Sequence, residues 1–112
     1  MKRLAAFVTT LAAYSSAATG AERWTYCVAS DLEAKVAWVS AVFQPAVNRE
    51  ILEAEFRAYV SSRFSKRVVA QCPSPKSDRT EVVNDAFAAE QFNQKLGAVV
   101  RVLAPRDFPL DR

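Results

Sequence analysis

The stretch "RVVAQCPSPKSDRTE", residues 67–81, marks the place where the chain passes from one kind of secondary structure to another. Its first six residues are rich in apolar and β-branched side chains and predict a strand. The loop "PSPKS" follows, and Asp78 with Glu81 three positions later resembles the capping box that begins a helix. The stretch therefore predicts a strand that ends in a cysteine, then a loop, then a helix.

The rest of the chain alternates in a similar way. Strand-like segments cover residues 23–30, 35–43 and 98–104, and a helical period covers 48–66 and the region from 78 to about 96. The short connection "DLEA" predicts that the first two strands form an antiparallel hairpin. The order strand, strand, helix, strand, helix, strand predicts an α+β fold. We expect a two-layer sandwich in which a four-stranded sheet carries both helices on one face.

Residues 1–21 have the layout of a secretory signal peptide. Lys2 and Arg3 precede an apolar run over residues 4–14, and small residues follow as far as Ala21. A helix of that run spans about 16 Å, roughly half of the ~30 Å hydrocarbon core of a membrane. The segment therefore predicts a cleaved leader rather than an anchor.

Cleavage is expected after Ala21, with Ala17 and Ala18 as alternatives, and leaves no stable membrane anchor. The exported protein would then be periplasmic or extracellular. Its predicted parts are a single α+β domain over residues 22–104 and a proline-containing tail over residues 105–112.

The charge of the chain depends on the leader. The full sequence has 15 basic and 12 acidic side chains, a net charge of +3, and removal of Lys2 and Arg3 leaves 13 and 12, or +1. A nearly neutral domain offers no electrostatic reason to bind nucleic acid, which requires a clustered basic face. We therefore expect no nucleic-acid partner.

The chain has two cysteines, Cys27 and Cys72. In an oxidising compartment a lone pair most often forms a disulfide, and closing a loop over 45 positions stabilises a domain by about 4 kcal/mol. A redox-active thiol usually needs a C-x-x-C partner or a thiolate-stabilising setting, and neither is visible. The prediction is a structural disulfide that holds the first and third strands close together.

Alternation along the strands divides their side chains into two sets. One set is small or aliphatic and contains both cysteines, so we expect it to lie beneath the two helices. The other set is aromatic and polar, and the residues expected to form an open binding face are Trp24, Tyr26, Trp38, Gln71 and Arg101. Packing alternatives are that the tail covers this face with Phe108 and Leu110, that two copies pair, or that the helices cover it instead.

Catalytic chemistry finds little support in the sequence. Histidine is absent, which excludes Ser-His and Cys-His arrangements, and the two glycines form no phosphate-binding loop. The carboxylates of Glu50, Glu53 and Glu55 alternate with arginines on a helix, as on an ordinary solvated face. We therefore predict no catalytic residue, cofactor or metal site, and no enzyme.

The sequence favours a small exported binding module. Its partner would be a protein, a component of the cell envelope or a second copy of the chain. An alternative is a secreted inhibitor of a hydrolase that acts through the loop 73–79, with Lys76 and Arg79 as its contact residues. A carboxylate-based hydrolase that uses the helix around Glu53 is a weaker alternative.

Overall fold

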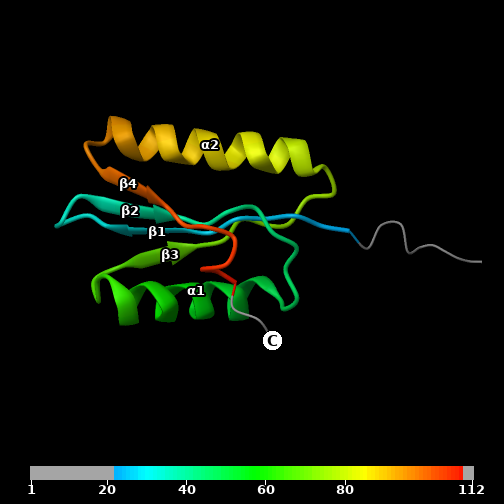
Figure 1. Cartoon of the computed structure of the whole chain (residues 1–112), viewed down its shortest axis with the longest axis horizontal. Helices are drawn as coiled ribbons and strands as arrows, with labels where there is room; N and C mark the ends of the chain where they lie inside the picture. The colour runs from blue at the N-terminus through cyan, green and yellow to red at the C-terminus, as the bar shows by residue number, and fades with distance from the viewer. Residues whose placement is uncertain (1–21, 110–112) are drawn as a thin grey trace, which may run out of the picture.

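Six elements of secondary structure follow one another in the part of the chain that the computed structural model describes, residues 22–109. They are β1 (Val28–Asp31), β2 (Val36–Val39), α1 (Arg49–Arg63), β3 (Val69–Gln71), α2 (Arg79–Lys95) and β4 (Val99–Val102). They form a four-stranded mixed sheet with two helices, and the α+β class and the element order are as predicted (Figure 1). The predicted leader, residues 1–21, and the tail residues 110–112 lie outside the described residues.

The strands lie in the order β3-β1-β2-β4. Strand β1 is antiparallel to both β2 and β3, whereas β2 and β4 are parallel. Asp31 pairs with Val36 across a four-residue turn, so the predicted hairpin is confirmed. Strands β3 and β4 are the two edges, and the pairing of β1 with β3 confirms that the first and third strands are neighbours.

Both helices begin where a side chain can cap them. The side-chain amide oxygen of Asn48 accepts a hydrogen bond from the Ile51 N–H, and the Asp78 carboxylate accepts hydrogen bonds from the N–H groups of Thr80 and Glu81. Gly97, at φ +91°, lies just past the end of α2, in a conformation that glycine adopts at low cost. Neither described helix combines the length and apolarity needed to span a membrane.

The two helices lie on opposite faces of the sheet, which corrects the prediction of both helices on one face (Figure 1). Helix α1 packs on β3 and β1, and α2 packs on β4 and β2. The reason is the route of the chain. It crosses from β2 over β1 to β3 through α1, and then returns across the whole sheet to β4 through α2. Parallel crossovers keep one hand, so reversing the direction of travel moves the connecting helix to the other face.

The predicted division of side chains between faces is also wrong across the hairpin. Ala29 pairs with Trp38 on one side and Ala70 on the other, and Trp38 pairs with Arg101. Paired residues point to the same face, so the small side chains of β1 and β3 share a face with Trp38 and Arg101 of β2 and β4. We call this the α1 face, and the other the α2 face.

The core on the α1 face contains the disulfide and part of the tail. Cys27 and Cys72 are bonded, as predicted, and are almost completely buried. Phe108 is 2% exposed, and its ring contacts the rings of Phe43, Phe56 and Tyr59 at centroid distances of 5.8, 4.9 and 5.6 Å. Phe108 therefore joins the core between α1 and the sheet instead of covering an open aromatic face as the packing alternative proposed, and Leu110 lies outside the described residues.

Candidate functional site

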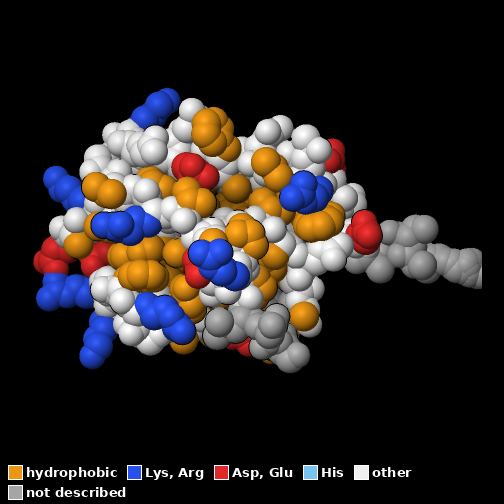
Figure 2. Space-filling model, in the orientation of Figure 1, with side chains coloured by type: hydrophobic (Ala, Val, Ile, Leu, Met, Phe, Trp, Pro, Cys, Tyr) orange, Lys and Arg blue, Asp and Glu red, His pale blue; other side chains and the backbone are white. Residues whose placement is uncertain are grey.

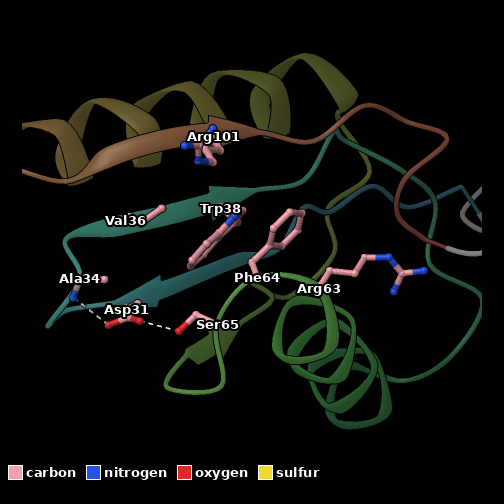
Figure 3. A pocket seen from close by; sticks show the side chains of 8 residues that line it. All are labelled: Asp31, Ala34, Val36, Trp38, Arg63, Phe64, Ser65 and Arg101. Carbon is pink, nitrogen blue, oxygen red and sulfur yellow. Dashed lines mark hydrogen bonds between the residues drawn. The ribbon is translucent and has the colours of Figure 1, made fainter.

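A groove of about 460 Å³ opens on the α1 face, where α1 ends and leaves β2 and β4 uncovered (Figure 3). Helix α1 packs on β3 and β1, so the neighbouring half of this face has no helix over it. The residues that line the groove are Asp31, Ala34, Val36, Trp38, Arg63, Phe64, Ser65 and Arg101.

The floor of the groove is a pair of stacked aromatic rings. The Trp38 indole rises from β2, and the Phe64 ring comes from the C-terminal cap of α1 (Figure 3). Their centroids are 5.5 Å apart with an interplanar angle of 21°. Trp38 is 4% exposed, whereas Phe64 is 49% exposed. Phe64 therefore covers the indole and presents its own outer side to solvent.

The indole nitrogen of Trp38 is buried and has no hydrogen-bond partner among residues 22–109. A buried N–H without an acceptor costs about 1–3 kcal/mol. This nitrogen belongs to the residue that forms the floor of the groove.

Two arginines contribute to the walls in different ways. Arg101 on β4 is exposed, and its side chain makes no hydrogen bond or ion pair within residues 22–109. The Arg63 guanidinium lies 4.4 Å from the centroid of the Tyr59 ring and donates to the Ser62 hydroxyl, and in Figure 3 it extends away from the aromatic pair. Arg101 is thus the cation that the groove offers to a ligand.

Asp31 closes the groove at the hairpin and is held by its own neighbours. Its carboxylate accepts hydrogen bonds from the Ser65 hydroxyl and from the Ala34 N–H, 2.5 and 2.9 Å long (Figure 3). These hydrogen bonds, with a smaller contribution from Arg67, lower its pKa from the ordinary value, and desolvation opposes them only in part. Asp31 is therefore ionised at neutral pH and serves to fasten the hairpin to the end of α1.

The structure brings together only two of the five residues predicted for the open face. Trp38 and Arg101 meet in the groove on the α1 face. Tyr26 is buried in the core beneath α2, and Trp24 packs against that same core. Gln71 is exposed on the edge strand β3, in register with Val28 on the α2 face. The predicted face is thus divided between the two sides of the sheet.

The α2 side of the molecule also holds the predicted contact residues of the loop 73–79. The Lys76 ammonium binds the Asp85 and Glu81 carboxylates at 2.8 Å each, and these hydrogen bonds raise the pKa of Lys76. The Arg79 guanidinium lies 5.2 Å from the Trp24 ring. Both cations therefore have partners within the chain, which gives no support to an inhibitory role of this loop.

The helix carboxylates that were considered for catalysis lie apart from the groove. The Glu53 carboxylate accepts the Cys72 N–H at 2.9 Å and lies 3.8 Å from the Arg49 side chain. It thus holds the exit of β3 against α1. Among the described residues no three acidic or sulfur side chains come together as a metal site would require.

Sequence reasoning missed Phe64 as a groove residue. The apolar period of residues 48–66 places Phe64 on the same side of the helix as Val60, which favours a core position, and its ring does stack on the core residue Trp38. The available signal was its position at the end of α1, where the backbone leaves helical geometry at φ −129°. A residue at that position is only half covered by its own helix.

Comparisons of the chain with protein-family models, with curated proteins and with solved structures find no match.

Proposed function

We propose that the protein is an exported, non-catalytic binding module that captures a protein segment in the groove on the α1 face. The observation that carries the proposal is the stacked pair of Trp38 and Phe64 beside Arg101, a cation that has no partner within the described residues. Trp and Arg are enriched among the residues that dominate binding energy at interfaces.

The chemistry of the groove suggests which segment it takes. An apolar or aromatic side chain would stack on the exposed side of Phe64, which is 49% exposed. A neighbouring carboxylate would pair with the planar guanidinium of Arg101, which can donate two parallel hydrogen bonds to it. The preferred ligand is therefore a segment with an acidic residue next to a large apolar one.

Export is supported by two independent features. The Cys27–Cys72 disulfide is typical of proteins that leave the reducing cytosol. The layout of residues 1–21 resembles a leader for secretion. The two features agree with each other, because an exported domain of this size often needs a covalent supplement to a modest core.

Selection from a library of random displayed peptides tests the proposal, with residues 22–112 as the bait. We expect enrichment of sequences that combine an acidic and an aromatic or large aliphatic residue. The selected peptides should bind the Arg101→Gln variant at least about tenfold more weakly, because a charged hydrogen-bond partner is lost.

The matched control is Gln71→Glu, which adds a negative charge to the other edge strand on the opposite face. It should leave the affinity for the selected peptides unchanged. A library that yields no acidic peptides, or peptides that bind wild type and Arg101→Gln equally, would contradict the proposal.

A further inference from the structure

Three connections between elements of secondary structure lie together at one end of the molecule (Figure 1). The N-termini of the two helices and the disulfide lie away from this end. They are the β1–β2 turn, residues 32–35, the α1–β3 connection, residues 64–68, and the α2–β4 connection, residues 96–98. The Glu33 carboxylate pairs with Arg67, which joins the first connection to the second. The Lys35 carbonyl accepts the Val99 N–H at 2.9 Å, which joins the first to the third.

This end carries an excess of positive charge. Its exposed cations are Lys35, Lys66, Arg67 and Lys95, and Figure 2 shows basic side chains gathered there. Glu33 is the one exposed acid within or next to these connections in the described residues, and it is paired with Arg67. Arg63 and the buried, ionised Asp31 also adjoin these connections and cancel each other, so the end has a net charge of +3 in a mature chain whose total is +1.

Exposed aliphatic side chains lie among these cations. Leu32 at the tip of the turn is 76% exposed, Leu96 at the end of α2 is 61% exposed and Val99 is 59% exposed. Leu32, Leu96 and Lys35 border the same small cavity of about 80 Å³, so they are close in space. Packing within the domain does not explain these residues, because most of their surface faces solvent.

The favourable interaction of cations with helix C-termini explains only part of the charge. Lys95 lies in the last turn of α2, where it offsets the negative end of the helix dipole. Lys35 lies in a β-turn, and Lys66 follows α1 by three residues. Their positions give no such benefit to the fold.

We infer that this end docks reversibly on a membrane surface rich in anionic phospholipid. Leu32 and Leu96 would enter the headgroup layer, and the surrounding cations would lie against the phosphates. The charge of the end is complementary to that of such a surface, and isolated aliphatic side chains between cations suit a shallow interface. Three of the four cations are lysines, a residue depleted from protein–protein interfaces, which favours lipid over an acidic protein.

The residues proposed to contact lipid do not line the groove of the proposed function, although Ala34, Phe64 and Ser65 of the same connections do. Binding to anionic lipid does not depend on the identity of the protein ligand. The inference of lipid docking and the proposed function can therefore fail independently. Docking by this end would leave the Arg101 side of the groove free for a partner held near the membrane.

Flotation with lipid vesicles tests the inference. The protein is residues 22–112, which contain every residue of both core clusters and the disulfide. We expect binding to vesicles of equimolar phosphatidylcholine and phosphatidylglycerol, much weaker binding to phosphatidylcholine alone, and loss of binding at high salt.

The variant Lys35→Gln/Lys66→Gln/Lys95→Gln should bind anionic vesicles about 100-fold more weakly, since each cation near the surface contributes about fivefold. The matched control neutralises three exposed arginines elsewhere, Arg23→Gln/Arg57→Gln/Arg106→Gln, and has the same net charge. We expect the control to lose far less affinity. Equal losses in the two triple variants would overturn the inference, because the net charge of the protein, and not the cations of this end, would then explain its attraction to the vesicles.

Two further variants separate the contribution of an exposed aliphatic side chain from that of the groove arginine. Leu32→Ser should weaken vesicle binding about tenfold without changing the melting temperature, because Leu32 contributes little to the core. Arg101→Gln should leave vesicle binding nearly unchanged. Binding to soluble polyglutamate as strong as to anionic vesicles, or no binding to either vesicle, would overturn docking on lipid.

Discussion

Phe108 offers a sharp test of how the domain is held together, because it lies in a tail that follows the last strand. The described part of the tail is short, yet the ring of Phe108 is 2% exposed. It contacts three aromatic rings, those of Phe43, Phe56 and Tyr59, which come from the segment after β2 and from α1. Replacement by alanine would remove the ring from the centre of this cluster and leave a cavity.

Phe108→Ala should lower the free energy of unfolding by about 3–5 kcal/mol, the usual cost of truncating a buried phenylalanine. Edge-to-face contacts such as those with Phe43 and Phe56 add about 0.5–1.5 kcal/mol per pair beyond area burial, which places the expectation toward the upper end. A domain of this size has a total stability of ~5–10 kcal/mol. The melting temperature should therefore fall by roughly 15–30 °C.

Urea unfolding followed by circular dichroism measures the change, with the disulfide intact in both proteins. The matched control is Phe87→Ala on the outer side of α2, where the ring is 57% exposed. It should change stability by no more than about 0.5 kcal/mol. If Phe108→Ala cost less than about 1 kcal/mol, the tail would not belong to the core, and the reasoning would be refuted.

Three further changes test individual contacts. Cys27→Ala/Cys72→Ala should lower stability by about 4 kcal/mol, measured by urea unfolding, because it removes a loop closure over 45 residues. The pKa of Asp31 is lowered in the folded state, so its stabilisation is complete above the ordinary value of 3.8 and is lost as the pH falls through the folded pKa. Asp31→Asn should therefore flatten the decline of melting temperature below about pH 4. The pKa of Lys76 is raised, so its stabilisation is complete below 10.5 and is lost as the pH rises through the folded pKa. Lys76→Gln should reduce the loss of stability in strongly alkaline solution, and an unchanged alkaline profile would argue against the ion pairs with Asp85 and Glu81.

The local features of the sequence predicted local structure well. Asn48 and Asp78 begin the two helices, Gly97 follows the second, and Cys27 is bonded to Cys72. Each of these features acts through neighbours in the chain or through a single covalent pair. The strands are shorter than predicted because only short central parts pair continuously, and outside them isolated bridges join Trp24 to Lys76 and Thr25 to Phe43.

The groove could not be predicted from the same features, because it depends on where each helix lies across the sheet. Helix α1 covers only β3 and β1, and the strand order that causes this places β1 between β2 and β3. No residue pattern within β2 or β4 records that order. Trp38 and Arg101, two residues predicted for a binding face, both line the groove, whereas Phe64 was not predicted to line it.

One signal for the division of the faces was present in the hairpin. An antiparallel turn with an even number of loop residues pairs odd-numbered positions with even-numbered ones. The turn over residues 32–35 has four, so Ala29 pairs with Trp38 and not with a residue such as Ala37 or Val39. The connection "DLEA" also has four residues and implies the same parity. Placing the small side chains of the first two strands, such as Ala29 and Ala37, on one face is therefore inconsistent with this turn.

The pairing of Ala29 with Trp38 also explains why the two helices lie on opposite faces of the sheet, each over a different pair of strands. Within the pair β1 and β3, Cys27, Ala29 and Ala70 share one face, as the alternation predicted. Within the pair β2 and β4, Ala37 and Val100 likewise share a face. Each helix packs on the small side chains of one pair, because small residues let a helix approach the sheet closely. Because of the hairpin register, the small side chains of β1 and β3 lie on one face and those of β2 and β4 on the other. Each helix therefore covers two strands of its face and leaves the other two uncovered. On the α1 face that half belongs to β2 and β4, and there Trp38, left outside the helix, forms the floor of the groove.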